Sequence, residues 1–337
     1  MSQAEIENGI DGAVAGEPAG EPVVRVRNLR KVYKGGVVAN DDISLDIRAG
    51  EVLGLLGANG AGKTTLIMQM LGLLKATAGS VEVLGHDVVA DASAAKAPVN
   101  YLPQGQISHR ELKVDRALYI TGRLRGLAGP EAAAQPEHWI ERLDLREMRG
   151  RAVEKLSGGM NRLASFAITL MVNPRLIVLD EPTNELDPVR RRQIWDIVEE
   201  LNTDGVTVVL VTHNVLEAER VIQRVAIVSN GSIRAMGSPG ELKERLGDEV
   251  RLEIVLRVGN GNGNGAARLR EVLAPLEPVE VRPGRFITIS PRTDAGRYVG
   301  RILTGLDGAL DDFRVAPPTL EDVYVQLEGE TIDQMDQ

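Results

Sequence analysis

Between residues 23 and 247, apolar positions form short continuous runs that are separated by turns and amphipathic stretches. Continuous apolar runs, rather than alternating ones, are typical of strands that are buried on both faces of a sheet. We predict strands at 23–26, 43–47, 52–56, 80–84, 100–102, 176–179 and 206–211. Helical stretches lie between many of these runs, and this alternation predicts an α/β domain around a mainly parallel sheet.

The middle and the end of this domain have different patterns. Residues 110–172 carry almost no strand signal and predict a helical subdomain, with helices near 111–127, 131–147 and 157–172. Asn230 and Gly231, between two short apolar runs, predict a hairpin. Ser238, Pro239 and Glu241 have the spacing of a capped helix start. We expect this helix to close the domain near residue 247.

A second apolar pattern begins after this helix. Alternation at 250–258 places Val250, Leu252, Ile254, Leu256 and Val258 on one face of a strand. The following segments predict a helix, two strands joined by a Pro-Gly turn, a helix and a strand, at 266–276, 279–282, 285–290, 294–306 and 312–315. The order β-α-β-β-α-β predicts a small ferredoxin-like α+β domain over 249–327.

The two ends of the chain and its composition limit the classes of function. Residues 1–22, rich in Gly, Glu, Ala and Pro, predict a disordered tail, and residues 328–337 predict an acidic tail. A formal net charge of −9 and 3% aromatic residues argue against a nucleic-acid partner. The absence of cysteine excludes disulfides, thiolate metal sites and cysteine nucleophiles.

A membrane-spanning helix needs about 20 apolar residues, and no run in the chain approaches this length. If the protein serves transport, we therefore expect another chain to supply the membrane path.

A phosphate-binding loop is the strongest chemical signal in the sequence. Residues 57–64 fit the pattern G-x-x-x-x-G-K-[ST], between an apolar strand and an amphipathic helix. Glycines let backbone N–H groups converge on phosphates, Lys63 adds a positive charge, and Thr64 offers a hydroxyl to Mg²⁺. The glycine spacing does not fit a dinucleotide-binding turn. The predicted nucleotide-binding residues of this segment are Gly57, Asn59, Gly60, Ala61, Gly62, Lys63, Thr64 and Thr65.

Two carboxylates follow the apolar run at 176–179. Alternation along a strand would send Asp180 and Glu181 in different directions. We predict that Asp180 supports the metal and that Glu181 polarises the attacking water as a general base. Alone, the pair would more simply be a solvated acidic turn, but the phosphate loop upstream favours the catalytic interpretation.

Three segments in order resemble the ATP-binding cassette (ABC) ATPases: the phosphate loop, Leu-Ser-Gly-Gly-Met at 156–160 and Leu-Asp-Glu-Pro at 179–182. The resemblance covers roughly 23–247 and implies a P-loop NTPase fold of the ABC nucleotide-binding type. It implies ATP and Mg²⁺ as cofactors and catalytic roles for Lys63, Glu181 and His213. Tyr33 matches the aromatic residue that stacks on adenine. Gln104 matches the glutamine that contacts magnesium and relays the nucleotide state to a membrane partner.

The resemblance also implies a nucleotide site shared between two cassettes. Ser157, Gly158 and Gly159 match the signature that contacts the γ-phosphate bound by the opposite protomer, and Asp187 matches the aspartate of the loop across the dimer seam. Ser157 is also a suitable N-cap on physical grounds. Two residues depart from the family pattern. Met160 stands where glutamine is common, and Glu185 stands where a small residue is common, which puts an extra carboxylate near the predicted seam.

The C-terminal segment 318–324, Pro-Thr-Leu-Glu-Asp-Val-Tyr, resembles the ending of ATPases that serve multidrug and antibiotic export of the daunorubicin-resistance type. The resemblance implies the ATPase subunit of an exporter, peripheral at the cytoplasmic face of the membrane. It would act as a homodimer or a pseudo-symmetric cassette dimer and energise a separate transmembrane permease for drug, antibiotic or lipid-like cargo.

Two alternatives are a soluble ABC ATPase without a transport role and an ATP-binding regulatory module with little turnover. The first would be expected to show paired cassettes, a zinc module, a long coiled coil or a basic face. Glu181 and His213 argue against the second, because a module that only holds ATP needs neither group.

Overall fold

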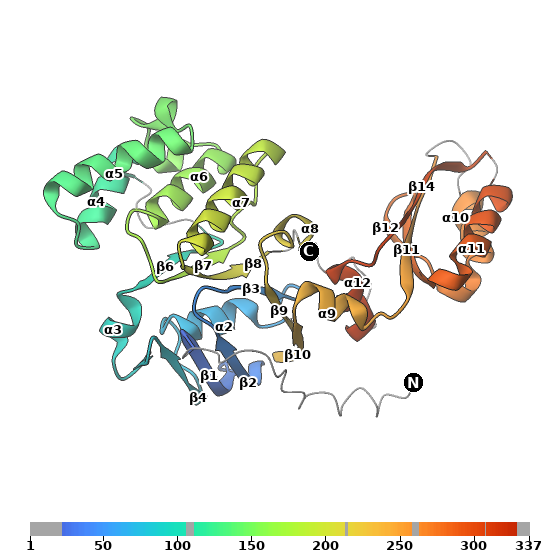
Figure 1. The fold of residues 1–337 in the computed structure, drawn as a ribbon, viewed down its shortest axis with the longest axis horizontal. Helices are drawn as coiled ribbons and strands as arrows, with labels where there is room; N and C mark the ends of the chain where they lie inside the picture. Colours follow the sequence, from blue (N-terminus) through green and yellow to red (C-terminus); the bar gives the residue numbers. More distant parts are fainter. Residues whose placement is uncertain (1–21, 106–110, 213–214, 258–262, 307, 329–337) are drawn as a thin grey trace.

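The computed structural model describes residues 22–105, 111–212, 215–257, 263–306 and 308–328. We call residues 22–247 the cassette and residues 249–328 the C-terminal region. The cassette contains two sheets, with a group of helices at one end, and the C-terminal region contains a separate sheet with helices beside it (Figure 1).

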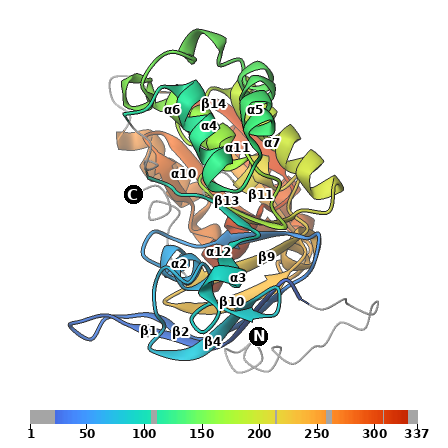
Figure 2. The same ribbon diagram turned by 90° about the vertical axis from the view of Figure 1, so that its left-hand side faces the viewer.

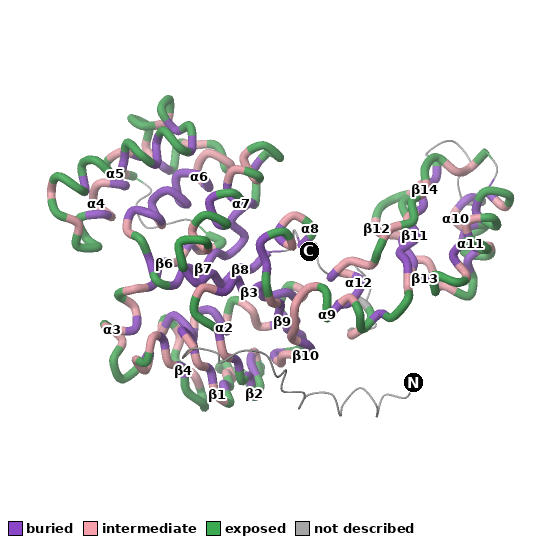
Figure 3. The backbone as a smooth tube through the Cα atoms, in the orientation of Figure 1, coloured by how far each residue is buried: buried purple, intermediate pink, exposed green. Residues whose placement is uncertain are grey.

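A six-stranded sheet forms the centre of the cassette. Its order is β10(Ser232–Gly237), β9(Arg224–Ser229), β3(Val52–Leu56), β8(Thr207–Val211), β7(Leu176–Asp180) and β6(Val99–Leu102). The five strands from β9 to β6 run parallel, and β10 is antiparallel to β9. Every residue of β3, β7 and β8 is buried, as expected for strands covered on both faces (Figure 3). The predicted parallel sheet is therefore confirmed.

The strands predicted at 23–26, 43–47 and 80–84 form a sheet of their own. It has the order β2(Val38–Ile47), β1(Val24–Val32), β4(Ala78–Val83) and β5(His86–Asp87), and all its pairs are antiparallel. The connection between β1 and β2 is short, and a short connection joins antiparallel neighbours. Figure 2 shows this sheet below α2(Lys63–Met70). Leu66 and Ile67 of α2 share an apolar cluster with Val24 and Leu45, so the helix that follows the phosphate loop is packed on this second sheet.

Helices occupy the region predicted as a helical subdomain. They are α4(Val114–Leu124), α5(Gly129–Arg142) and α6(Gly158–Thr169), with short 3-10 turns at Arg146–Met148 and Val153–Lys155. The helix α3(Ala92–Lys96) precedes β6, and α7(Pro188–Thr203) follows β7. Leu118, Ile140 and Phe166 are fully buried in the same cluster as residues of the central sheet. The helical subdomain is therefore packed onto the sheet rather than tethered to it.

Local signals at the end of the cassette are confirmed. Asn230 and Gly231, both with positive φ, form the turn between β9 and β10. After the short helix α8(Val215–Ala218) and this hairpin, α9(Pro239–Glu244) begins with a capping box. The Ser238 Oγ accepts a hydrogen bond from Glu241 N, and Glu241 Oε2 accepts one from Ser238 N.

The C-terminal region contains a four-stranded antiparallel sheet of order β12(Val279–Arg282), β13(Arg285–Pro291), β11(Glu249–Leu256) and β14(Leu310–Ala316). The helices α10(Gly263–Val272) and α11(Arg292–Gly305) and the 3-10 turn Ala274–Leu276 complete a β-α-β-β-α-β order. Val250, Leu252, Ile254 and Leu256 of β11 are buried in one apolar cluster with residues of both helices. Val258, predicted on the same face, lies outside the described residues.

The last helix, α12(Leu320–Glu328), packs on the cassette. Its residues Leu320, Val323 and Tyr324 belong to the cluster that contains Val215 of α8 and Leu242 of α9. Figure 1 shows α12 beside α9, away from the helices of the C-terminal sheet. The sequence pattern places this segment in the accessory domain. The apolar stripe of a short helix does not indicate which of two neighbouring surfaces it packs against, so the pattern could not predict the contact with the cassette.

Candidate functional site

The loop between β3 and α2 depends on glycine at two positions. Gly57 has φ 152°, and a Cβ atom there would lie 2.1 Å from the carbonyl oxygen of Val228. Gly62 has φ 103°, and its Cβ would lie 2.3 Å from the carbonyl oxygen of Ala39. Any side chain at either position would clash with backbone atoms. The motif glycines therefore let the loop fit between β9 and the start of β2.

Lys63 bridges the two ends of this loop. Its Nζ donates hydrogen bonds to the carbonyl oxygens of Gly57, at 2.7 Å, and Ala58, at 2.9 Å. Burial lowers the pKa of Lys63, and the nearby carboxylates of Glu181 and Asp180 oppose this effect. A partly desolvated ammonium at the mouth of a glycine-rich turn is suited to binding phosphate oxygens.

The acidic pair lies across from Lys63. Asp180, the last residue of β7, is 2% exposed, and its Oδ2 has no hydrogen-bond partner. Burial raises the pKa of Asp180 to about 6, and Glu181 adds to the rise while Arg162 and Lys63 oppose it. Glu181 has φ 54° and lies beyond the strand, with its N–H donating to Val211 O at 2.8 Å. The strand thus ends at Asp180 and the chain turns at Glu181, so the strand alternation that we expected does not extend to Glu181, and both carboxylates line the same pocket.

Most of the predicted nucleotide and metal residues line one pocket. Its lining residues are Ala39, Asn59, Gly60, Gly62, Lys63, Thr64, Thr65, Gln104, Asp180, Glu181 and Val211. Gly57 and Ala61 belong to the same loop, and Ala61 is buried. Tyr33 is exposed, and its hydroxyl lies 3.3 Å from Thr65 Oγ1. The aromatic ring therefore stands beside the start of α2, close to the loop.

A second group of predicted residues lies outside this pocket. Ser157, Gly158 and Gly159 are at the N-terminus of α6, and Ser157 has the N-cap conformation but makes no side-chain cap hydrogen bond. Asp187 caps α7, since its Oδ1 accepts hydrogen bonds from the N–H groups of Val189 and Arg190, both at 3.0 Å. His213 lies outside the described residues.

Glu185 connects these two helix ends. A Cβ atom on Gly158 would lie 1.5 Å from Glu185 Oε2, and one on Gly159 would lie 2.8 Å from Glu185 O. The loop before α7 is thus in close contact with the start of α6. The backbone contact requires a small residue at 159, whereas at 158 the contact is with the flexible end of the Glu185 side chain. The extra carboxylate noted in the sequence lies directly against the signature helix.

Two residues of the site were missed by the sequence analysis. Arg162 of α6 is buried and donates to the carbonyl oxygens of Pro103, at 2.6 Å, and Asp180. Burial lowers the pKa of Arg162 to about 10, with Asp180 and Glu181 opposing the effect. Asn40 is fully buried and donates to Gly62 O at 3.1 Å. For Arg162, the sequence offered one signal, an arginine among the apolar residues of a predicted helix. Asn40 belongs to no motif, so no signal in the sequence marked it.

The fold and the pocket define a P-loop nucleotide-binding protein. The sequence family described as ABC transporter matches residues 40–184. The chain is 35% identical over 313 residues to the daunorubicin resistance ATP-binding protein of Streptomyces coeruleorubidus, and this alignment covers 92% of this chain and 97% of that protein. It is 33% identical over 313 residues to the daunorubicin/doxorubicin resistance ATP-binding protein of Streptomyces peucetius, covering 92% and 93%.

Among solved structures, the ATP-binding subunit of an ABC transporter aligns with a TM-score of 0.63 and 24% identity, covering 67% of this chain and 93% of that one. This similarity shows the fold of the cassette. The sequence matches show that the protein belongs to the ABC transporter ATP-binding family, and it resembles the daunorubicin-resistance ATP-binding proteins. It is an ATPase.

The raised pKa of Asp180 predicts that Asp180→Asn stabilises the nucleotide-free protein. The folded-state pKa of about 6 lies above the ordinary value of 3.8, so the ionised carboxylate costs stability at any pH above 6, and this cost disappears as the pH falls toward 4. We expect the free energy of unfolding to rise by about 2–3 kcal/mol at pH 8 and by much less at pH 4.5. Urea unfolding in EDTA, followed by the fluorescence of the buried Trp195, measures this.

The control is Asp204→Asn at an exposed position. It should give no gain at either pH. An equal gain from Asp180→Asn at both pH values, or a loss at pH 8, would contradict the proposed cost of burying the charge.

Proposed function

We propose that this chain is the ATPase subunit of an exporter, peripheral at the cytoplasmic face of the membrane, where two cassettes pair and drive a separately encoded permease. The observation that carries this proposal is the arrangement of the site. One pocket combines the phosphate loop, Lys63 and a buried carboxylate, while the signature residues at the start of α6 lie outside it.

Mg²⁺ fits the residues around Asp180. The buried Oδ2 of Asp180 makes no hydrogen bond and would be available as a ligand to a divalent cation, and Thr64 and Gln104 line the same pocket with neutral oxygen atoms. In the described ranges, no group of three or more His, Cys, Asp or Glu residues could hold a metal alone. Asp180, Thr64 and Gln104 would therefore share the ion with phosphate and water oxygens, and the bound ion would neutralise charge on the phosphates.

The residues of the pocket suit in-line attack of water on the γ-phosphate. Tyr33 would stack on the adenine, and the loop from Gly57 to Thr65 would hold the phosphates through backbone N–H groups. Lys63 would stabilise charge on the transferred phosphoryl group, and Glu181 would accept the proton of the attacking water. His213 would contact the γ-phosphate, as the family resemblance implies.

The second group of residues would complete the site of another cassette. Ser157 and Gly158 are exposed, and the N-terminus of α6 carries a partial positive charge that favours a phosphate. Gly159 and Asp187 would lie at the same seam. In a two-fold symmetric dimer each phosphate loop would face the signature of its partner, which makes two composite sites.

The membrane path and the cargo are the remaining parts of this proposal. No helix in the described ranges is long and apolar enough to span a bilayer, which is consistent with a permease on another chain. Both Streptomyces relatives are named for daunorubicin resistance. We infer a drug, an antibiotic or a lipid-like amphiphile as the cargo, moved out of the cell.

Transport of a fluorescent anthracycline tests this function. Cells that express the chain together with its cognate membrane permease should accumulate less of the drug than cells that express Glu181→Gln with the same permease. Equal accumulation would contradict drug export. Co-purification with nucleic acid instead of a permease would favour a non-transport ABC ATPase, and ATP binding without turnover would favour a regulatory module.

A further inference from the structure

A residue of the C-terminal helix contacts the phosphate loop. The N–H of Ala58 donates a hydrogen bond to Tyr324 Oη at 3.3 Å. Tyr324 lies in α12 and is 4% exposed, in an apolar cluster against which Ala58 also packs. The chain thus brings its last described helix to the first turn of the loop that binds nucleotide.

This hydrogen bond fixes the N–H side of one peptide group, and the carbonyl side of the same group accepts a hydrogen bond from Lys63. The N–H of Ala58 and the carbonyl of Gly57 belong to the same planar peptide unit. Lys63 Nζ donates to that carbonyl at 2.7 Å, while Tyr324 Oη accepts from the N–H. Rotation of this peptide would disturb both hydrogen bonds together. The orientation of the Gly57 carbonyl, which accepts the hydrogen bond from Lys63, therefore depends on the hydroxyl of Tyr324.

The position of α12 is itself fixed by buried polar contacts. Thr319 and Asp322 form a capping box, with Thr319 N donating to Asp322 Oδ2 at 2.7 Å and Asp322 N donating to Thr319 Oγ1 at 3.3 Å. Arg251 of β11 donates to Asp322 Oδ1 at 2.8 Å and to Thr319 Oγ1 at 3.1 Å. Both partners of this ion pair are buried.

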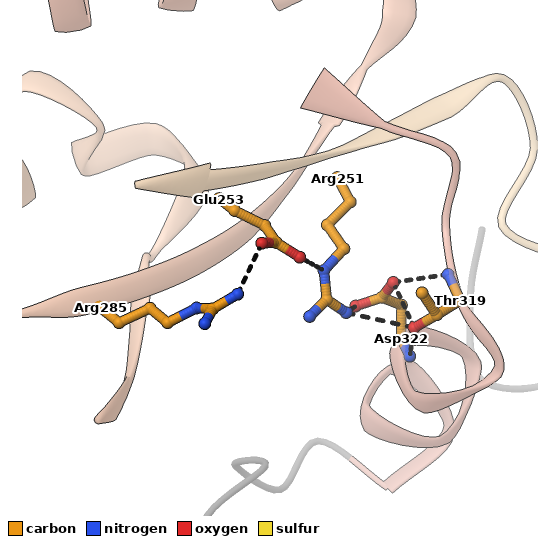
Figure 4. Close-up of polar contacts among 5 residues, drawn as sticks. All are labelled: Arg251, Glu253, Arg285, Thr319 and Asp322. Atoms are coloured by element: carbon orange, nitrogen blue, oxygen red, sulfur yellow. Dashed lines mark hydrogen bonds and ion pairs between the residues drawn. The ribbon is translucent and has the colours of Figure 1, made fainter. Parts of the chain in front are cut away.

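Figure 4 shows that these contacts continue into the C-terminal sheet. Glu253 accepts hydrogen bonds from Arg251 Nε and from an Arg285 nitrogen, each at 3.0 Å. A buried pair that also satisfies its remaining hydrogen bonds holds one geometry, because breaking it would leave a charge buried without compensation. The start of α12 is therefore anchored on β11, and its following turn is packed on the cassette.

We propose that Tyr324 is a positioning residue for the phosphate loop, supplied by the C-terminal helix and held by the ion pair between Arg251 and Asp322. The inference rests on the proposed binding of ATP at this loop and adds to it a contribution from outside the cassette. The hydroxyl fixes the Gly57–Ala58 peptide in the orientation that receives Lys63, so that the loop is preorganised for the phosphates.

The direct test is Tyr324→Phe, which keeps the buried ring and removes the hydroxyl. We expect the Kd of a fluorescent ATP analogue to rise about three- to tenfold, as for the loss of one neutral hydrogen bond. The KM for ATP should rise similarly while kcat at saturating ATP stays close to that of the wild type. Amide exchange of a peptide that contains Ala58 should become faster.

The matched control is Tyr298→Phe in α11, a buried tyrosine whose hydroxyl accepts a hydrogen bond from Arg297 within the C-terminal region. It should leave the Kd and the exchange at Ala58 unchanged. Wild-type behaviour of Tyr324→Phe, or the same loss in both variants, would overturn the proposal. If the wild-type chain itself binds no ATP analogue, the proposed function fails, and that outcome is distinct.

A second variant tests the anchor. Asp322→Asn keeps an acceptor for Thr319 but removes the charge that pairs with Arg251. We expect it to raise the Kd in the same direction as Tyr324→Phe and to speed exchange at Ala58. A variant that is less heat-stable but has an unchanged Kd and unchanged exchange would overturn the part of the proposal that concerns the ion pair.

Discussion

Replacing Glu181 with glutamine is expected to leave ATP bound while lowering steady-state hydrolysis by about a hundredfold or more. The side chain lies in the pocket with Lys63 and Asp180, and its backbone has left the strand at φ 54°. An amide has nearly the shape of the carboxylate but cannot accept the proton of the attacking water. Binding depends on the loop and on Lys63, which the substitution leaves intact.

Phosphate release and binding of a fluorescent ATP analogue, measured on the same preparation, separate these two effects. The control is Glu199→Gln at an exposed position of α7, which removes a carboxylate that does not line the pocket. It should keep wild-type turnover. Turnover of Glu181→Gln close to that of the wild type would remove Glu181 from the role of general base.

Mixing two inactive variants is expected to restore occlusion of nucleotide. In Lys63→Ala both loops of the dimer are damaged, and in Ser157→Arg both signature helices are blocked. In the proposed dimer each site would take its loop from one chain and its signature from the partner, so a mixed dimer would carry both lesions in one site and none in the other. We expect about one occluded ATP per mixed dimer on this two-fold symmetry argument.

The experiment needs proof that mixed dimers form, which two different affinity tags on the chains provide. Each variant alone, with ATP and Mg²⁺, is the matched control. No gain over either variant alone would contradict a shared site, and Ser157 would then be only the cap residue of α6. The structure is consistent with sharing because Ser157 lies outside the pocket that Lys63 lines.

The parts of the fold that could be predicted from the sequence are those with a local cause. Three fully buried strands gave continuous apolar runs, and Ser238 and Glu241 marked a capping box, because each signal lies within a few residues. The separate antiparallel sheet was not predicted. Its strands are assembled by pairing of β1 with β2 and β4, and pairing between strands leaves little trace in the apolar pattern of one strand.

The site shows the same division between local and long-range causes. The phosphate loop and the acidic strand end were visible because their chemistry needs particular residues at fixed spacing. Arg162, Asn40 and Tyr324 were missed because each contacts a backbone atom far away in the chain. A residue that acts through a distant carbonyl or N–H group carries no spacing rule, and only the folded chain brings the two together.

Steady-state release of inorganic phosphate by the purified full-length chain tests the central claim most directly. The measurement compares the wild type with Lys63→Ala at saturating ATP and Mg²⁺. We predict sustained release by the wild type and release at the level of the protein-free reaction by Lys63→Ala. Wild-type release no faster than that of Lys63→Ala would contradict an ATPase site built on this loop.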